Sequence, residues 1–413
     1  MTTAPFFAFA STRRRMYEGP LGSYVDEYIQ ELREQGYLQH SIRGKVRVIA
    51  DFSRWLDGQK LGPDDVGRDR VKRFLVYRKR IKCWTFGDAA ALREMADLLF
   101  RKRVTPMTDS SIVLNERELL EECFRNYLLQ DRGLSPATLK CYLPVVSRFL
   151  REHFLDAPVR CGELICADIT GFVQRHAHGY SHSRAQMLVT ALRAFLRYLH
   201  HRGRTAIDLA ASVPGVAGWS FSKLPVFLRP DQIKRVLDHC DRKTPIGRRD
   251  YAVLLLLARL GLRAGEVAAL TLDEINWGHG SLSIRNKGGR WTQMPLPHEV
   301  GVAISDYVTN GRPSCTDRHV FIRDQAPRIG FSRWNSVSVI ASRALVRAGI
   351  DSPRKGAHIF RHALATQMLR QGASLSQIGQ LLRHQHPDTT RIYAKVDLPA
   401  LRTLALPWLG GVR

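Results

Sequence analysis

Four short segments in the last part of the chain concentrate basic side chains and end in a tyrosine. They are Gly261-Leu262-Arg263-Ala264-Gly265-Glu266, Asn286-Lys287-Gly288-Gly289-Arg290, His358-Ile359-Phe360-Arg361, and Leu382-Arg383-His384 followed by Thr389-Thr390-Arg391-Ile392-Tyr393. Guanidinium and ammonium groups bind phosphate oxygens, histidine transfers protons near neutral pH, and a tyrosine hydroxyl can act as a nucleophile. Together, the four segments could bind a phosphate and attack it.

Each segment also has an ordinary structural explanation when it is taken alone. An arginine such as Arg263 is usually solvated or ion-paired, and Lys287 at a glycine-rich turn is typical of a solubilising residue or a simple phosphate contact. His358 and Arg361 would share one face of a helix, as a polar surface or as ligands of one phosphate. Tyr393 could be a half-buried aromatic residue with its hydroxyl at the surface. The functional prediction therefore depends on the four segments occurring together.

In this order and at this spacing, the segments resemble the motifs of the tyrosine recombinases, also called the phage integrase family. The resemblance covers roughly residues 225–400 at the level of motifs, and more loosely 116–203 as the family's helical core-binding domain. The catalytic positions of the family fall on Arg263, Lys287, His358, Arg361, His384 and the nucleophile Tyr393.

Two features differ from the usual family pattern. Members usually have Leu-Gly-His before the second histidine, whereas Arg383 replaces the glycine here, which could alter the turn or add a phosphate contact. His386 is close enough to His384 to compete for the same assignment. The block at 24–103 goes beyond the usual two-domain plan, and its role is open.

The resemblance implies a reaction in which a tyrosine attacks a phosphodiester of DNA. Arg263 and Arg361 would clamp the non-bridging oxygens, where charge accumulates in the transition state. Tyr393 has an ordinary pKa near 10, so surrounding cations and a base such as His358 should help it to lose its proton. The product would be a covalent 3′-phosphotyrosyl bond.

The remaining positions complete this expected site. Lys287 would be the general acid for the departing 5′ hydroxyl, and His384 would hydrogen-bond the scissile phosphate. Arg290, Arg383 and Arg391 are expected to contact DNA. No cofactor and no metal is expected, because the sequence has no Gly-x-x-x-x-Gly-Lys-Ser/Thr loop and no carboxylate cluster spaced for two metals.

Family resemblance further implies a homotetramer that exchanges strands between two double-stranded DNA sites, with accessory recombinases or DNA-bending proteins as possible partners. The apolar tail Leu398–Arg413 could pack on a neighbouring subunit or on its own domain. Integration, transposition and resolution all remain open, and a mobile-element enzyme is preferred because of the additional N-terminal block.

Helical periodicity dominates the first half of the chain. Residues 24–103 and 116–203 both show apolar residues at spacings of three and four, and the two blocks look like copies of one unit. The copy places Gly36 on Gly133 and Phe52 on Phe149, although amphipathic helices in general also resemble one another.

The expected fold class is mainly α, with apparently duplicated SAM-like core-binding units followed by a mostly helical catalytic domain that has a small antiparallel β-sheet. The domain prediction is 1–110 for the additional domain, 111–205 for the core-binding domain, 206–224 for a linker and 225–413 for the catalytic domain. Pro230 is expected in a first helical turn. Ser281–Asn286 and Arg290–Met294 are the expected strands of a hairpin.

Composition favours nucleic acid as the partner. Lys and Arg number 63 against 38 Asp and Glu, which gives a formal net charge of +25. Such an excess attracts polyanions, and its spread along the chain disfavours a membrane-surface anchor. Tyr251–Leu257 is only a short buried run, too short for a membrane span. The N-terminal charge order does not fit a secretory signal, and the seven scattered cysteines indicate a reduced, cytoplasmic compartment. Within it, we expect a protein that acts on DNA to be nucleoid-associated.

Two other functions remain to be weighed. A type IB-like DNA topoisomerase would share the whole tyrosine site. A non-catalytic DNA-binding protein would use Ala373–Val396 as a helix-turn-helix, with Ser374 capping a helix through Ile378 and Leu382. The second alternative would leave Arg263 and Lys287 without a role.

Overall fold

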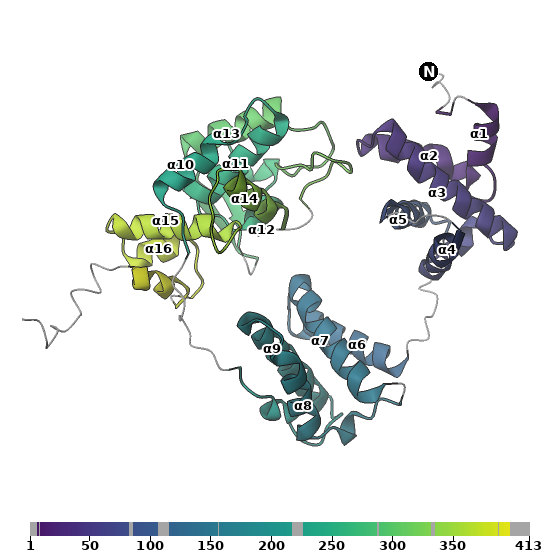
Figure 1. Ribbon diagram of the computed structural model, residues 1–413, viewed down its shortest axis with the longest axis horizontal. Helices are drawn as coiled ribbons and strands as arrows, with labels where there is room; N and C mark the ends of the chain where they lie inside the picture. The colour runs from purple at the N-terminus through teal and green to yellow at the C-terminus, as the bar shows by residue number, and fades with distance from the viewer. Residues whose placement is uncertain are drawn as a thin grey trace, which may run out of the picture. The chain divides into compact units, whose positions relative to one another are not determined.

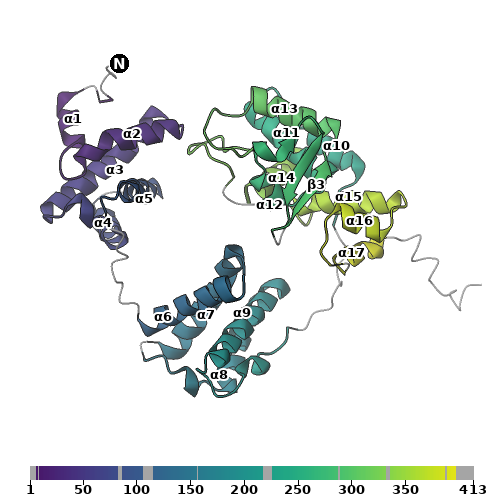
Figure 2. The same ribbon diagram turned by 180° about the vertical axis from the view of Figure 1, so that it is seen from behind.

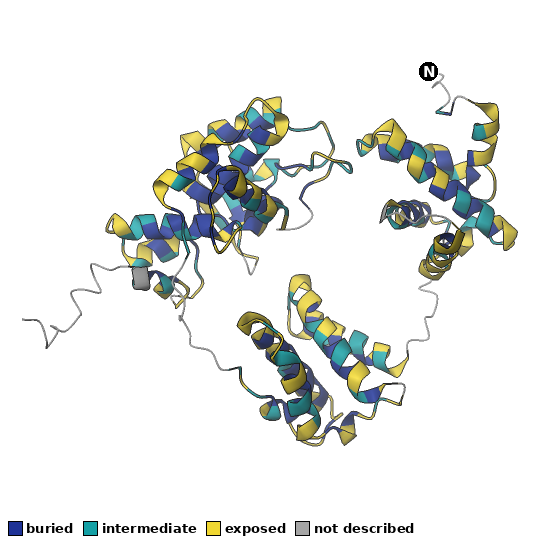
Figure 3. Ribbon diagram, in the orientation of Figure 1, coloured by how far each residue is buried: buried dark blue, intermediate teal, exposed yellow. Residues whose placement is uncertain are grey.

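The computed structural model describes residues 6–7, 9–81, 86–105, 115–155, 157–216, 226–286, 289–331, 335–386 and 388–396. Helices dominate these residues, and their strands form a small antiparallel sheet, so the expected mainly α fold class is confirmed (Figure 1). Buried hydrophobic side chains form separate cores in the N-terminal, middle and C-terminal parts, and Figure 3 shows the buried face of the helices in each. None of the described helices combines the length and the apolar character needed to cross a bilayer.

The N-terminal part is helical, as expected for residues 24–103. Its helices are α1 (Ala10–Met16), α2 (Val25–Glu34), α3 (Gln39–Gly58), α4 (Arg68–Ile81) and α5 (Phe86–Arg101), with short 3-10 turns at Gly22–Tyr24 and Pro63–Asp65. Tyr28 and Leu32, one helical turn apart, are both buried in its core.

The middle part is a second helical unit. It contains α6 (Glu116–Asn126), a π turn at Tyr127–Asp131, α7 (Pro136–Phe154), a 3-10 turn at Cys161–Glu163, α8 (Cys166–Ala177), α9 (His182–His201) and a 3-10 turn at Leu209–Ser212. Asn115 caps α6 by accepting a hydrogen bond from the Glu118 amide at 2.9 Å, and Ser135 caps α7. Side-chain oxygens at these positions satisfy amides that have no partner within the helix.

The two helical parts match at several positions, which supports the interpretation as copies. The glycine that follows the first helix of each pair has a positive φ, +81° at Gly36 and +60° at Gly133, where a side chain would be strained. Phe52 and Phe149 are both buried. Buried residues also match on the last helices, where Ala91, Leu92 and Leu99 correspond to Ala191, Leu192 and Leu199.

The expected linker over 206–224 is folded in its first part, which corrects that prediction. Leu209, Ala210 and Val213 are buried in the core of the middle part. The Asp208 carboxylate accepts a hydrogen bond from the Ala210 amide at 2.9 Å and so caps the 3-10 turn. A 3-10 turn of this length is too short to show periodicity in the sequence.

The C-terminal part surrounds one apolar helix. Its elements are α10 (Pro230–Asp238), α11 (Pro245–Arg259), α12 (Ala264–Ala269), β1 (Ile275–Asn276), β2 (Ser281–Arg285), β3 (Trp291–Pro295), α13 (His298–Asn310), α14 (Asn335–Arg347), α15 (His358–Arg370), α16 (Leu375–Leu381), α17 (Asp388–Arg391) and 3-10 turns at Leu272–Glu274 and Ile392–Val396. Residues 252–258 of α11 are all buried, so the short apolar run is a core helix. Pro230 starts α10, as expected.

The sheet confirms the expected hairpin and adds a strand. Leu282 of β2 pairs with Met294 of β3 and with Ile275 of β1. The hairpin closes where the Asn286 amide donates to the Arg290 carbonyl oxygen at 2.7 Å. β1 escaped the sequence analysis because two residues cannot show an alternating pattern.

Candidate active site

Glu266 lies at the centre of the basic cluster in the C-terminal part. It is buried in the first turn of α12 and accepts three hydrogen bonds, from the Arg263 amide at 2.8 Å, from Arg263 Nη1 at 2.7 Å and from Arg383 Nη2 at 2.8 Å. Burial alone would raise the pKa of this carboxyl, but Arg383 and Arg263 outweigh it and lower the pKa. Glu266 is therefore ionised and positions Arg263, whose side chain keeps partial access to solvent.

Arg383 is a second buried partner of this carboxylate. Its backbone has a φ of +55°, in the left-handed region that favours glycine, and its side chain is buried against Glu266 and Met294. The guanidinium thus points into the domain, and the expected contact of Arg383 with a phosphate stays a prediction. Strain of about 1–2 kcal/mol at such a φ must be offset by the buried ion pair.

Arg361 connects three segments of the site. It is only 4% exposed and donates to the Gly261 carbonyl oxygen at 2.5 Å and to the Leu382 carbonyl oxygen. Burial, together with the charges of Arg263 and Arg383, lowers its pKa to about 9, which leaves it protonated at neutral pH. Gly261 permits the close approach, because a Cβ there would lie 2.8 Å from a methyl carbon of Leu382.

The predicted histidines lie beside these cations. Partial burial, Arg361 and Arg263 all lower the pKa of His358, which starts α15 one turn before Arg361. His384 Nδ1 lies 2.7 Å from Thr390 Oγ1, and burial, Arg361 and Arg263 lower its pKa to about 4. Both imidazoles are neutral at pH 7 and can accept or donate one hydrogen bond each.

Tyr393 lies in a small hydrophobic cluster with Ala365, Ile378 and Leu382 and is 2% exposed. α15 and α16, which contribute to this cluster, lie together with α17 at one end of the C-terminal part (Figure 2). Burial raises the pKa of the phenol to about 12, and Arg361 opposes this rise. The positive charge of Arg361 therefore lowers the pKa of Tyr393 as expected, but burial raises this pKa by more.

The hydroxyl of Tyr393 meets a histidine that the sequence analysis did not select. It lies 3.0 Å from Nδ1 of His362, while the expected base, His358, has no hydrogen bond to it. Burial, then His358 and Arg354, lower the pKa of His362 to about 4, so this imidazole is neutral and can accept the phenol proton. His362 lies four residues after His358, so both histidines share one face of α15. This i, i+4 spacing is the sequence signal that could have identified His362.

Comparison with known proteins agrees with this geometry. Residues 226–398 match the phage integrase family. The chain is 44% identical over 396 residues to the integrase/recombinase y4rA of Sinorhizobium fredii, covering 95% of this chain and 96% of that protein. The chain belongs to the phage integrase family. It is therefore a tyrosine-type DNA strand transferase, and its function lies in DNA recombination.

More distant relatives extend the comparison. The tyrosine recombinase XerD of Listeria monocytogenes is 29% identical over 68% of this chain and 94% of its own length. The solved structure of the XerH recombinase bound to its palindromic difH substrate has a TM-score of 0.56 at 17% identity, covering 82% of this chain and 94% of that one. The structure of a λ integrase dimer bound to a COC′ core site has a TM-score of 0.50 at 17% identity, covering 66% of this chain and 93% of that one. At these identities, the two structures show a shared fold.

Other residues predicted for the recombinase site lie apart from the cluster or outside the described residues. Arg290 is exposed beside β3, and Arg391 is exposed in α17 and pairs with Asp388 at 2.8 Å. Lys287 and the tail from Leu398 fall outside the described residues. Both exposed arginines remain candidates for DNA contact.

The helix-turn-helix alternative has a correct local detail but no support as a recognition motif. Ser374 does cap α16, by accepting from the Gln377 amide at 3.2 Å. Ile378 and Leu382 are buried around Tyr393, however, and α17 has four residues. So short a helix cannot carry several base contacts into a major groove.

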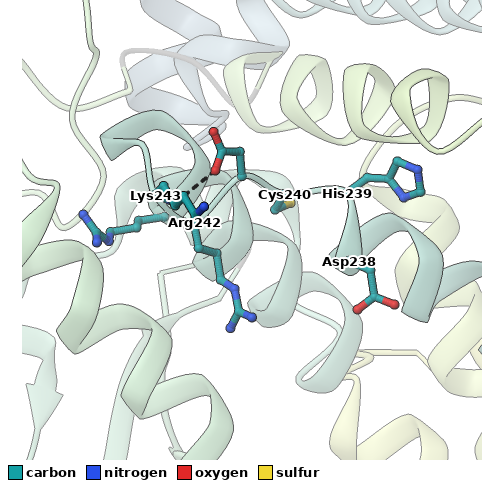
Figure 4. Close-up of a pocket in the computed structure, with 7 residues that line it drawn as sticks. Asp238, His239, Cys240, Arg242 and Lys243 are labelled. Atoms are coloured by element: carbon teal, nitrogen blue, oxygen red, sulfur yellow. Dashed lines mark hydrogen bonds between the residues drawn. The ribbon is translucent and has the colours of Figure 1, made fainter.

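A hollow of about 580 Å³ lies elsewhere, at the turn between α10 and α11. Figure 4 shows its side chains diverging, with Arg242 and Lys243 directed away from His239, so they do not converge on one ligand. Within the described ranges, no three His, Cys, Asp or Glu side chains are grouped as metal ligands.

Replacing Arg383 by glycine tests the competition between strain and charge. We expect Arg383→Gly to lower the free energy of unfolding by about 1–2 kcal/mol, because loss of the ion pair at Glu266 outweighs the relief of a left-handed side chain. Urea denaturation measures the change. In a Glu266→Gln background the same substitution should cost clearly less, and a glycine variant more stable than the parent would show that strain dominates.

His362 is expected to assist proton removal from Tyr393. His362→Phe keeps a ring of similar size but removes the acceptor, so covalent adduct formation at pH 7 should slow by roughly 10²-fold. The rate of the variant should then rise steeply with pH, because an unassisted phenol must ionise by itself. Single-turnover cleavage at several pH values measures both effects, and a parent-like rate and pH profile would contradict the role.

Proposed function

We propose that the protein is a site-specific recombinase that cuts and rejoins DNA through a covalent 3′-phosphotyrosyl bond to Tyr393. The observation that carries the proposal is the surplus of positive charge in the arginine cluster, which acts on this hydroxyl through Arg361. Arg263 and Arg383 bind the buried carboxylate of Glu266, and Arg361, which is bonded to two backbone carbonyls, adds a third positive charge to the same cluster. Buried like charges repel one another, so a phosphate that enters between them would be bound strongly.

The arginines differ in what they can offer a phosphate. Arg263 is partly exposed and is held by Glu266 through its amide and through Nη1, so its outer face can bind a non-bridging oxygen. Arg361 has spare guanidinium hydrogens beyond those donated to two carbonyls. Together they would stabilise the charge that builds up as phosphorus becomes five-coordinate.

Tyr393 must leave its apolar cluster before it can attack. As the hydroxyl approaches phosphorus, its proton passes to the neutral His362 or to a similar base, and the oxygen forms the new bond to phosphorus. The bond to the 5′ oxygen breaks, and this oxygen takes a proton from a general acid. We assign that role to Lys287, which stands between β2 and β3 in the sequence. His384 would hydrogen-bond the phosphate.

Rejoining reverses the same steps. A 5′ hydroxyl from a second strand attacks the phosphotyrosine, and the tyrosine leaves with its proton, so the ester energy is conserved without a nucleotide cofactor. We further propose a tetramer on two DNA sites, because the λ integrase neighbour of the same fold was solved as a tetramer bound to a Holliday junction. We also propose three domains, with 1–110 and 225–413 as expected and with the middle domain, expected over 111–205, extended to include Leu209–Ser212 and Val213.

A topoisomerase would use the same tyrosine chemistry on one duplex. The similarity to y4rA and XerD, both named as recombinases, favours exchange between two sites. An assay with two cognate sites on one plasmid separates the two activities, because only a recombinase inverts or deletes the segment between them.

Tyr393→Phe tests the nucleophile directly. The variant should bind DNA like the parent but form no covalent adduct, because only the attacking oxygen is lost. A nicked suicide substrate taken from DNA that flanks the gene, followed by denaturing gel electrophoresis, measures the adduct. Phenylalanine at another buried tyrosine, Tyr307→Phe, is the matched control and should keep the adduct. An adduct that persists at position 393 without the hydroxyl would rule the assignment out.

A further inference from the structure

Helix α4 of the N-terminal part carries a dense run of basic residues that the active site does not use. They are Arg68, Arg70, Lys72, Arg73, Arg78, Lys79 and Arg80, against one carboxylate, Asp69. We infer that the outward face of α4 binds the phosphate backbone of duplex DNA and is a DNA surface separate from the catalytic part. The inference rests on the proposed action on double-stranded DNA.

Buried contacts on its inner face fix how α4 is turned. Arg78 is buried and donates from Nε to Asp88 at 2.7 Å and from Nη1 to Asp51 at 2.6 Å, which ties α4 to α5 and α3. One turn earlier, Phe74 is buried with its ring 4.9 Å from that of Phe52. With positions 74 and 78 inward, the remaining basic residues must face outward or sideways.

The outward face is a strip of charge with little internal neutralisation. Its exposed basic residues are Arg68, Lys72, Arg73, Lys79 and Arg80. Lys72 pairs weakly with Asp69 at 3.7 Å, and Arg73, Lys79 and Arg80 have no carboxylate partner within the described ranges. The strip from Arg68 to Arg80 is about 18 Å long at the helical rise per residue. A duplex carries about ten phosphate charges over that length.

The basic strip is not required by the fold, as the copy in the middle part shows. α8 occupies the same place in the order of helices, and its Phe172 is buried as Phe74 is. α8 has only Arg175 and His176 as basic residues, with Asp168 as an acid. The same scaffold therefore forms without the charge, and the charge on α4 needs another explanation.

A polyanion matches this surface better than a protein partner does. Tyr77 is 44% exposed among the basic residues, and its ring lies 6.3 Å from that of Trp55, so aromatic and cationic groups alternate as they do on nucleic-acid surfaces. Val76 and Ile81 are also exposed and would suit contact with another protomer. The experiment must separate these two occupants.

The test measures how DNA binding depends on salt. Full-length protein carrying Tyr393→Phe, which prevents covalent capture, is titrated against a labelled duplex of about 40 base pairs of arbitrary sequence at several salt concentrations. The test variant is Lys79→Gln with Arg80→Gln. The control is Arg101→Gln with Lys102→Gln, which also removes two adjacent basic residues from a helix end of the same part. In the control, both residues are paired, with Glu31 and Glu27, each at 2.7 Å.

Removal of two backbone contacts should lower the slope of log affinity against log salt by about 2 and weaken binding by roughly tenfold or more near 0.1 M salt. The control should keep the parent slope. Circular dichroism melting of each variant must match the parent, so that loss of folding does not imitate loss of contact.

Two outcomes would overturn the inference about α4, and a third would contradict the proposed function. Equal slopes for the test and control variants would overturn the inference about α4. An unchanged slope with weaker cooperativity in the test variant alone would also overturn it and would indicate a contact between protomers. A parent protein that binds no duplex DNA would instead contradict the proposed function, whatever the variants do.

Discussion

The buried carboxylate of Glu266 holds the catalytic part together electrostatically. Taking several guanidinium groups out of water is costly unless each finds an anion or a carbonyl oxygen. Glu266 serves Arg263 and Arg383, and two backbone carbonyls serve Arg361. This arrangement leaves an excess of positive charge that the protein cannot neutralise alone. The same excess of charge that costs stability would favour binding of a phosphate, as the proposed function requires.

Burial has the opposite effect at Tyr393, the proposed nucleophile. Tyr393 is buried among apolar side chains and contacts His362 through its hydroxyl, and burial keeps its phenol protonated. A protonated and covered tyrosine does not react with stray phosphodiesters. Attack requires both exposure and proton removal, so binding energy from DNA can be coupled to activation. The hydrophobic cluster would thus keep Tyr393 unreactive until DNA is bound.

The two helical parts illustrate how one scaffold accommodates different surfaces. Buried aromatic residues such as Phe74 and Phe172 fill the same place in each core, while the outward residues of α4 and α8 differ strongly in charge. Core packing restricts inner positions far more than solvent restricts outer ones. Charge can therefore change on the outer face while the fold is kept, and the net charge of +25 is distributed over surfaces beyond the catalytic part.

The sequence by itself determined the family, the helical nature of both repeats, the hairpin and the identity of most candidate site residues, because these depend on local periodicity and on motif order. Only the tertiary structure decided that His362, and not His358, faces Tyr393, and that Arg383 points toward Glu266 and not toward solvent. Which side chain meets which depends on how α15, α16 and α12 pack. At the contacts between these helices, residues far apart along the chain come together. The periodicity within one helix does not predict which residues of another helix it will contact.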